Sequence, residues 1–173
     1  ATITKYPGDI FSTTVKFNTA GALVSALQFR ITYPYTGTTP QLDVVDANGN
    51  VSNQIVTDPS LISSGWQFPL SPNLTRTNNT VTIDFSSLIV NSSGYSNNTD
   101  TNLATIYFKV NGVAATNPLV LSFDTVLSKM VTKSNPTDVL KTPTNGSFTI
   151  IADTTAPAAI NNYRYEPFPN DIH

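Results

Sequence analysis

Apolar and polar residues alternate with a period of two in several short runs of this 173-residue chain. In residues 27–33 (Leu-Gln-Phe-Arg-Ile-Thr-Tyr) every odd position is apolar and every even position is polar. Successive side chains of a β-strand point to opposite faces, so this run predicts a strand with one buried and one solvated face. The pattern recurs in residues 13–17, 81–85, 104–110 and 119–123. The alternation therefore predicts sheets that each cover one side of a hydrophobic core.

Shorter apolar runs predict further strands at Leu42–Val45, 66–68, 126–131 and 148–151, which with an N-terminal strand gives about nine. The chain contains 26 Thr and 18 Asn but a single Glu, a composition that favours strands and turns over helices. We therefore expect an all-β fold with two packed sheets. A short helix or an irregular excursion is expected near residues 59–64.

Two polar stretches predict loops, at residues 36–40 and at residues 91–102. The second stretch is rich in Asn, Ser, Gly and Thr, so it lacks the apolar side chains whose burial would order it. The alternation stops after Ile151, where Ala152-Asp153-Thr154-Thr155-Ala156-Pro157 predicts an exit from the sandwich.

The sequence thus divides into a β-sandwich domain at residues 1–151 and a following segment at residues 152–173. That segment is expected to be a linker or the start of a following module, because its Asp-Thr-Thr-Ala-Pro run resembles the opening of Ig-like repeats of bacterial surface proteins. Tyr163, Tyr165 and Phe168 give it an aromatic cluster that favours some docking over free disorder.

Composition excludes several classes of partner and site. The chain has no Cys, which removes disulfides and thiolate chemistry. A net charge of -2 and a pI near 5.1 provide no basic field for nucleic acid. No apolar run reaches membrane-spanning length, so we expect no membrane insertion within this sequence. Low charge and abundant Ser, Thr and Asn favour an extracellular or cell-surface location.

Catalytic constellations lack their components. The only histidine is His173, so triads that need histidine and histidine-ligated metal sites are not expected. A glycosidase needs two carboxylates on either side of one bond, and Asp84 and Asp124 are instead interpreted as solvated residues on or beside strands. We expect a protein without enzymatic activity.

Two weaker patterns suggest ligands. Asp43, Asp46, Asn48 and Asn50 gather oxygen ligands around Gly49 and suggest a structural calcium site, although a turn at Asn48-Gly49 explains the same residues. The aromatic residues Trp66, Tyr33, Tyr35, Tyr95 and Tyr107 suggest a platform for sugar rings. Alternation places Trp66 in the core with Phe68 and points only Tyr35 and Tyr107 outward.

Two groups of segments resemble the cohesin family. The first is residues 8–19 (Gly-Asp-Ile-Phe-Ser-Thr-Thr-Val-Lys-Phe-Asn-Thr) followed by residues 27–33, which is similar to the family's "G-D-x-F-x-V-x-V" strand and the strand after it. The second is residues 103–110 (Leu-Ala-Thr-Ile-Tyr-Phe-Lys-Val), then 119–124, then 145–150 (Asn-Gly-Ser-Phe-Thr-Ile). The order and spacing agree over nearly all of residues 1–151.

The resemblance implies a jelly-roll sandwich of about nine strands, one face of which binds a dockerin, a small calcium-loaded helical module of another protein. The polar positions that would point outward from that face are Gln28, Arg30, Thr32, Thr82, Asp84 and Ser86. An ordinary solvated sheet explains the same positions. Two departures from the family stand out. Tyr33-Pro34-Tyr35 replaces a Tyr followed by Asp-Pro, and Ala26 and Gln28 stand where cellulosomal cohesins offer Asn and Asp.

These observations favour a non-catalytic, extracellular protein-binding module that tethers a dockerin-like partner in a larger assembly. A carbohydrate-binding module, with polysaccharide as its partner, is the second hypothesis. A structural repeat or filament subunit of a cell-surface protein is the third.

Overall fold

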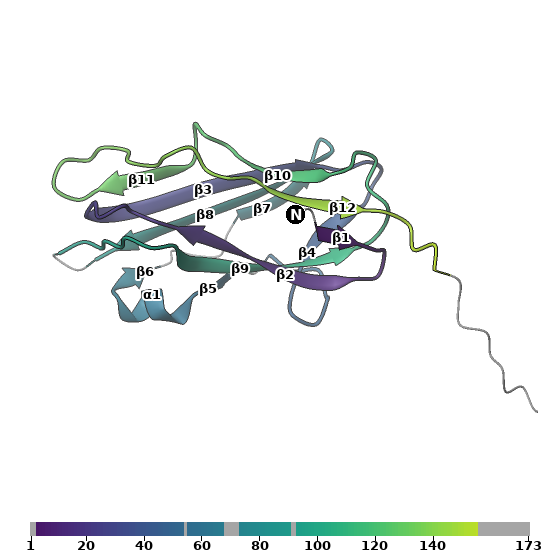
Figure 1. The fold of residues 1–173 in the computed structure, drawn as a ribbon, viewed down its shortest axis with the longest axis horizontal. Coiled ribbons are helices and arrows are strands. Elements are labelled where there is room, and N and C mark those ends of the chain that lie inside the picture. Colours follow the sequence, from purple (N-terminus) through teal and green to yellow (C-terminus); the bar gives the residue numbers. More distant parts are fainter. Residues whose placement is uncertain (1–2, 54, 68–72, 91–92, 156–173) are drawn as a thin grey trace, which may run out of the picture.

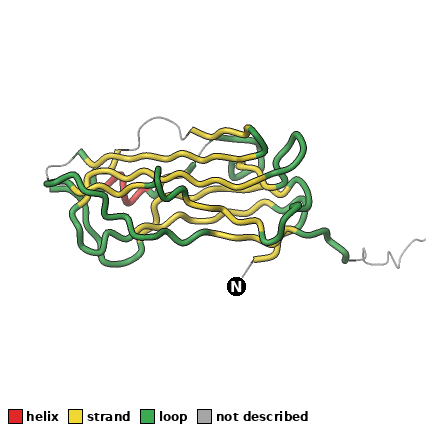
Figure 2. Tube along the Cα trace, turned by 90° about the horizontal axis from the view of Figure 1, so that it is seen from above, coloured by secondary structure: helices red, strands yellow, loops and turns green. Residues whose placement is uncertain are grey.

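The chain folds into a β-sandwich. The computed structural model describes residues 3–53, 55–67, 73–90 and 93–155. These residues form twelve strands and one short helix, arranged as two sheets that face each other (Figure 1). Figure 2 shows the strands running lengthwise through the molecule with loops at both ends. The predicted all-β, two-sheet sandwich is confirmed, and it contains more strands than the nine or so expected.

The larger sheet has eight strands. Their bounds are β1 Ile3–Lys5, β3 Val24–Pro34, β6 Trp66–Gln67, β7 Asn73–Thr77, β8 Thr80–Ile89, β10 Leu119–Phe123, β11 Lys129–Thr132 and β12 Gly146–Ile150. The strand order is β1-β12-β10-β3-β8-β6, with β11 also paired to β3 and β7 also paired to β8. β1 and β12 are parallel, and the other pairs are antiparallel.

The smaller sheet has four strands: β2 Ile10–Phe17, β4 Leu42–Val45, β5 Val56–Thr57 and β9 Thr101–Val110. β9 lies between β2 and β4 and also pairs with β5. β2 is therefore an edge strand within the part of the chain that the structure describes.

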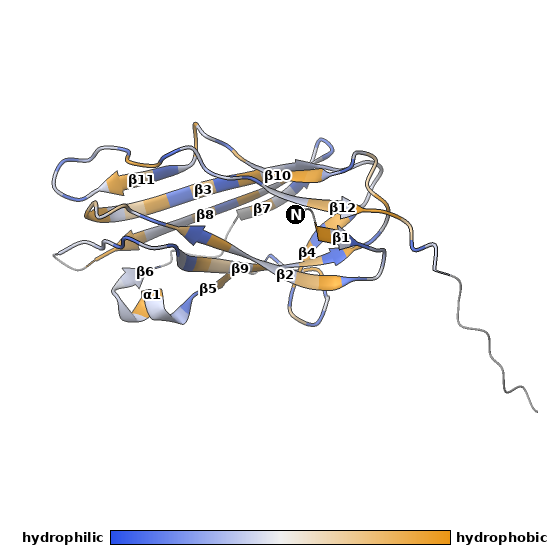
Figure 3. Ribbon diagram, viewed as in Figure 1, coloured by the Kyte–Doolittle hydropathy of each residue, from blue (hydrophilic) through white to orange (hydrophobic). Residues whose placement is uncertain are grey.

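Alternating side chains build the core between the sheets. The apolar residues of β3 and β8 face each other in register, with Phe29 opposite Phe85 and Ile31 opposite Ile83. The rings of Phe29 and Phe85 stack with centroids 4.9 Å apart and an angle of 13° between their planes. All four side chains are buried, and each such burial contributes about 1.5–3 kcal/mol. The resulting alternation of hydropathy is visible along β3 in Figure 3.

Trp66 lies in the core, as predicted, with 1% of its surface exposed. Its ring meets the rings of Phe17 and Tyr95 edge-on at centroid distances of 6.0 and 5.6 Å. The short helix expected nearby is α1, Pro59–Ser63, which precedes β6. Asp58 caps it by accepting a hydrogen bond from the Ser60 N–H at 2.9 Å. Among the described residues, no helix is long and apolar enough to span a membrane.

Two strands of the structure were not predicted from the sequence. β5 has only two residues. β7 carries a single aliphatic residue, Leu74, on a strand that otherwise contains polar side chains. A two-residue turn joins β7 to β8, and its residues Asn78 and Asn79 both have positive φ, 51° and 57°. That geometry matches the right-handed twist of a hairpin, so the Asn pair explains why β7 folds back onto β8.

Arg76 of β7 links the two sheets along one side of the sandwich. Its Nε lies 2.6 Å from Oδ1 of Asp43 on β4, and its Nη2 donates to the Val44 carbonyl at 3.2 Å. The Asp43 residue is 3% exposed. The Tyr33 ring is also fully buried, and burial together with the charge of Asp43 raises the pKa of its hydroxyl well above the ordinary value. The Arg76–Asp43 ion pair thus joins the two sheets on this side of the sandwich.

Two expectations about local structure were wrong. Residues 126–128, expected to be part of a strand, form a turn, and β11 begins only at Lys129. Residues 93–100, expected to lack order, are fixed by hydrogen bonds. Asn97 Oδ1 accepts from the Thr19 N–H at 2.7 Å, and the Asn97 N–H donates to Thr19 Oγ1 at 2.9 Å. Thr19 is 3% exposed, so these paired polar groups order the segment together with the ring of Tyr95, which packs against Phe17 and Trp66.

The following segment leaves the sandwich after Ile151, whose N–H donates to the Lys5 carbonyl at 3.2 Å. Residues 156–173, with Tyr163, Tyr165 and Phe168, lie outside the described residues, as does Phe68. The division at residue 151 stays a prediction.

Candidate protein-binding face

The six polar residues predicted for a binding face lie side by side on the outer surface of the larger sheet. β3 and β8 pair so that Gln28 is opposite Ser86, Arg30 opposite Asp84 and Thr32 opposite Thr82. The two strands alternate, with their apolar residues turned into the core, so these three cross-strand pairs share the solvent side. We call these six residues the polar face.

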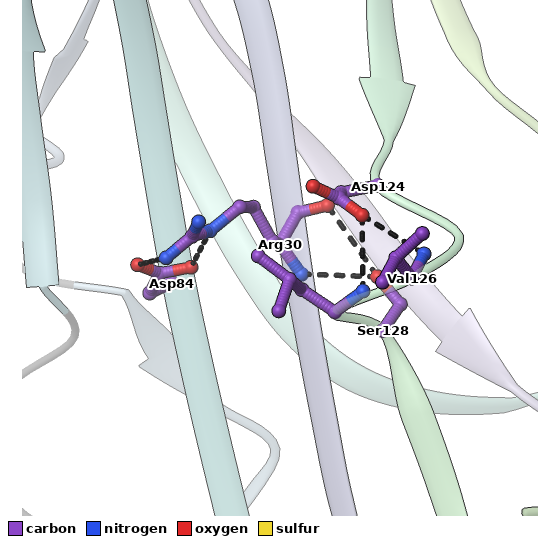
Figure 4. A network of polar contacts seen from close by, with 6 residues as sticks. Arg30, Asp84, Asp124, Val126 and Ser128 are labelled. Carbon is purple, nitrogen blue, oxygen red and sulfur yellow. Dashed lines mark hydrogen bonds and ion pairs between the residues drawn. The ribbon is translucent and has the colours of Figure 1, made fainter.

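An ion pair occupies the middle of the polar face. Arg30 Nε lies 2.6 Å from Asp84 Oδ1, and Arg30 Nη2 lies 2.7 Å from Asp84 Oδ2 (Figure 4). This is the two-pronged geometry in which a guanidinium binds a carboxylate most specifically. The hydrogen bonds with Asp84 raise the pKa of Arg30, and the positive guanidinium and the negative carboxylate face each other. The charges of Arg30 and Asp84 therefore offset each other, and Asp124 adds a negative charge beside them.

A turn beside Arg30 carries an exposed apolar side chain. Asp124 Oδ1 accepts hydrogen bonds from the N–H groups of Val126 at 2.9 Å and Leu127 at 3.0 Å, and these bonds lower the pKa of Asp124. Ser128, buried at the end of the turn, accepts a hydrogen bond from the Arg30 N–H at 3.1 Å. The turn thereby fills the gap between β10 and β11, and Val126 is 72% exposed on it.

An apolar row adjoins the other end of the polar face. Leu88 of β8 is opposite Ala26 of β3, which in turn is opposite Val131 of β11. Leu88 is 53% exposed, although it occupies the outward parity of Thr82, Asp84 and Ser86. This apolar row was missed in the sequence, but its signal was present, because the polar alternation of β8 changes to an apolar residue at position 88.

The four residues of the suggested calcium site have other partners in the structure. Asp43 is ion-paired to Arg76 as described above. Asp46 Oδ1 accepts from the N–H groups of Asn48 at 2.8 Å and Asn50 at 2.9 Å, so its carboxylate orders the turn. These hydrogen bonds lower the pKa of Asp46. Within the described residues, no three acidic or histidine side chains gather as a metal site. Calcium binding here stays a prediction.

The aromatic residues suggested for sugar binding mostly face inward. Trp66 and Tyr33 are each 1% exposed, and Tyr35, expected to point outward, is 9% exposed. Tyr95 packs against Phe17 with a centroid distance of 5.6 Å. Tyr107 is half-buried on the smaller sheet. A row of flat, exposed rings is therefore not formed by these five residues.

Comparison with known proteins identifies the family. A family model described as "Cohesin domain" matches residues 1–150. The chain belongs to the cohesin family. No curated protein matches the sequence. Solved cohesin structures share the fold of this cohesin at low sequence identity. The seventh ScaB type I cohesin from Pseudobacteroides cellulosolvens is 18% identical with a TM-score of 0.58, over 95% of this chain and 94% of that chain.

Two further cohesins have comparable similarity to this cohesin. CaCohA2 of Clostridium acetobutylicum, solved in complex with CaDoc0917, is 18% identical with a TM-score of 0.57, over 87% of this chain and 95% of that chain. A non-cellulosomal cohesin from the archaeon Archaeoglobus fulgidus is 17% identical with a TM-score of 0.53, over 87% of both chains. The predicted family resemblance is confirmed, and cohesin domains are non-catalytic binding modules.

The structure shows what replaces the family's expected polar pair in this cohesin. Ala26, where the resemblance places Asn, is the central residue of the apolar row. Gln28, where the resemblance places Asp, is exposed opposite Ser86. An apolar side chain thus replaces an amide at position 26, and a neutral amide replaces a carboxylate at position 28.

Proposed function

We propose that this cohesin is an extracellular, non-catalytic module that captures a dockerin-like module on the outer surface of its larger sheet and tethers the protein that carries it. The observation that carries the proposal is the alignment of the polar face into three cross-strand pairs, with the apolar row at one end. Solved relatives with the same fold are cohesins, one of them in complex with CaDoc0917.

The composition of this surface suits a helical partner. Protein interfaces combine a small apolar centre with a polar rim, and a few apolar or aromatic anchors supply most of the binding energy. Leu88 and Val126 are the exposed anchors here, and Gln28, Thr32 and Thr82 provide hydrogen-bonding groups along the same face. Because Arg30 and Asp84 offset each other and only Asp124 adds a charge beside them, the face recognises its partner mainly through hydrogen bonds and apolar contact.

This chemistry also defines the expected specificity. A dockerin that relies on the family's Asn and Asp would find an alanine and an amide in their place, at Ala26 and Gln28. We expect the preferred partner to offer apolar side chains opposite the row formed by Leu88, Ala26 and Val131. Dockerins selected by other cohesins should bind this one more weakly.

The two other hypotheses have less support. Polysaccharide binding needs exposed rings, and three of the five candidate aromatic residues are buried. A structural repeat requires no particular binding face and gives no role to the exposed Leu88. The proposal includes a linker or following module at residues 152–173, which would connect the cohesin to a larger surface or secreted assembly.

A pull-down tests the proposal. The immobilised 173-residue chain is incubated with the secreted proteins of its source organism, with calcium and then with EDTA, because the family resemblance implies a calcium-loaded dockerin. Retention of a dockerin-bearing protein with calcium and its loss with EDTA are expected. Retention of polysaccharide alone, or of proteins without a dockerin, would contradict the proposal.

A further inference from the structure

Exposed apolar side chains surround the point at which the chain leaves the sandwich, beside the end of β12 (Figure 1). Ile151 is 40% exposed, Tyr6 38% and Val113 47%. The Ile151 N–H donates to the carbonyl that precedes Tyr6 at 3.2 Å, and the N–H that follows Val113 donates to the carbonyl that precedes Ile151 at 3.3 Å. These bonds bring the three segments together. We call Tyr6, Val113 and Ile151 the exit surface.

The sandwich itself holds the exit surface in place. Asn117 fixes the last residue of β12, because its Oδ1 accepts from the Ile150 N–H at 2.8 Å and its Nδ2 donates to the Ile150 carbonyl at 3.0 Å. Ala114, next to Val113, is 7% exposed and belongs to the core. A segment that covers the exit surface therefore gains apolar burial without the cost of ordering this end of the sandwich.

The sequence after residue 155 is suited to cover it. Residues 156–173 contain five large apolar or aromatic residues, which are Ile160, Tyr163, Tyr165, Phe168 and Ile172. Linkers that stay in solvent contain few aromatic residues. In Tyr163-Arg164-Tyr165-Glu166 the rings alternate with charges, so an extended chain here has one aromatic face and one charged face. This pattern matches an apolar surface on one side and water on the other.

The length of the segment allows it to return to the exit surface. Residues 152–155 are exposed and carry the chain at most about 14 Å beyond Ile151. Tyr163 follows eight residues later, a reach of about 27 Å, so it can lie against Ile151. Tethering gives a surface this close an effective concentration of about millimolar, and that concentration falls for surfaces farther away. The exit surface is thus the favoured contact for this segment.

We propose that residues 156–173 dock on the exit surface of the same chain, with Tyr163 and Tyr165 against Tyr6, Val113 and Ile151. Arg164 and Glu166 then face solvent. The proposal is independent of the proposed function, because the two sites lie at opposite ends of the larger sheet. β12 ends beside the end of β3 that carries Pro34, whereas Leu88 is opposite Ala26 near the start of β3. The docked segment leaves the apolar row open to a partner.

Methyl NMR spectra of the full 173-residue chain test the docking. A ring that packs against a methyl group shifts its resonance, so Tyr163→Ser/Tyr165→Ser should move the Val113 and Ile151 methyl resonances and leave those of Leu88 unchanged. The substitutions lie outside the sandwich core. Unmoved Val113 and Ile151 resonances would overturn the proposal. A shift that disappears on dilution would overturn it as well, since the segment would then dock on a second copy.

Two matched controls separate this contact from general effects. Arg164→Gln/Glu166→Gln changes the alternate positions and should leave the Val113 and Ile151 resonances in place; shifts equal to those of the tyrosine variant would contradict the aromatic contact. Val113→Ser should reduce the ratio of docked to undocked chains about fivefold, because half of a valine side chain is no longer buried. The Ile151 resonance should then approach its position in the tyrosine variant. Leu23→Ser, at the start of β3 and 51% exposed, should have no such effect.

Discussion

Removal of Arg76 should destabilise the cohesin far more than removal of Arg30. Both arginines form ion pairs with an Nε to carboxylate distance of 2.6 Å, so geometry does not distinguish them. Burial does. The Asp43 side chain is 4% exposed and that of Arg76 is 22% exposed, whereas the side chains of Arg30 and Asp84 are 33% and 22% exposed.

The magnitudes follow from what each substitution leaves behind. Arg76→Met leaves the Asp43 carboxylate buried without a cation, which costs about 3–5 kcal/mol. Arg30→Met leaves Asp84 on a surface that water reaches, which costs about 0.5–1 kcal/mol. Asp43→Asn should fall between them, at about 1–3 kcal/mol, because Arg76 keeps its hydrogen bond to the Val44 carbonyl and a longer one to Asn53 Oδ1.

Urea unfolding followed by fluorescence measures these differences, because Trp66 is the only tryptophan and lies in the core. The slope of the unfolding free energy against urea should be the same in all variants, so that the midpoints report stability. Equal losses for Arg76→Met and Arg30→Met would refute the reasoning, since burial would then not determine the strength of the pair. A larger loss for Asp43→Asn than for Arg76→Met would refute it as well.

Three further predictions concern single residues. Gly49→Ala should destabilise the fold by about 1–3 kcal/mol in the same urea assay, because Gly49 has φ +84° and a Cβ there would collide with Ile10 Cδ1; an unchanged midpoint would contradict this. Asn97→Ala should speed amide hydrogen exchange of Thr19, whose N–H it holds, while exchange at Ile83 in the core should not change; unaltered exchange at Thr19 would count against this bond. Asp124 has a lowered pKa, so the stability it contributes should be complete above the ordinary carboxyl pKa of about 3.9 and be lost as the pH falls through the lower folded value. The difference in unfolding free energy between the wild type and Asp124→Asn should accordingly shrink in acid, and a difference that grows there would contradict the sign.

Strands with a regular period of two were predictable, and the structure explains why others were not. β3 and β8 alternate strictly, and their inward residues Phe29 and Phe85 set the register that aligns the polar face. β7 was missed because its inward position at residue 76 is an arginine, which breaks the apolar pattern. The same arginine pairs with Asp43, and the sequence did not indicate the burial of this aspartate, because an aspartate at an outward position of β4 becomes buried only when a distant strand supplies its partner.

The polar face was predictable in its members and not in its surroundings. Alternation identifies which residues point outward, but the cross-strand partners depend on the register, which only the packed core determines. The exposure of Val126 depends on the turn at residues 124–128, which Asp124 and Ser128 stabilise through backbone hydrogen bonds. Such local hydrogen bonds leave no periodic signal in the sequence, so an apolar residue there was assigned to a strand.

The central claim is that a dockerin-like partner binds the outer surface of the larger sheet. Isothermal titration calorimetry with the dockerin retained in the pull-down, in calcium, measures this for the wild type, for Leu88→Asp and for a control variant on the opposite sheet, Thr105→Asp. Because an apolar anchor that the partner buries supplies about 2 kcal/mol or more, Leu88→Asp should weaken binding about thirtyfold or more, and Thr105→Asp should have no effect. Unchanged affinity for Leu88→Asp, or an equal loss for Thr105→Asp, would contradict the account.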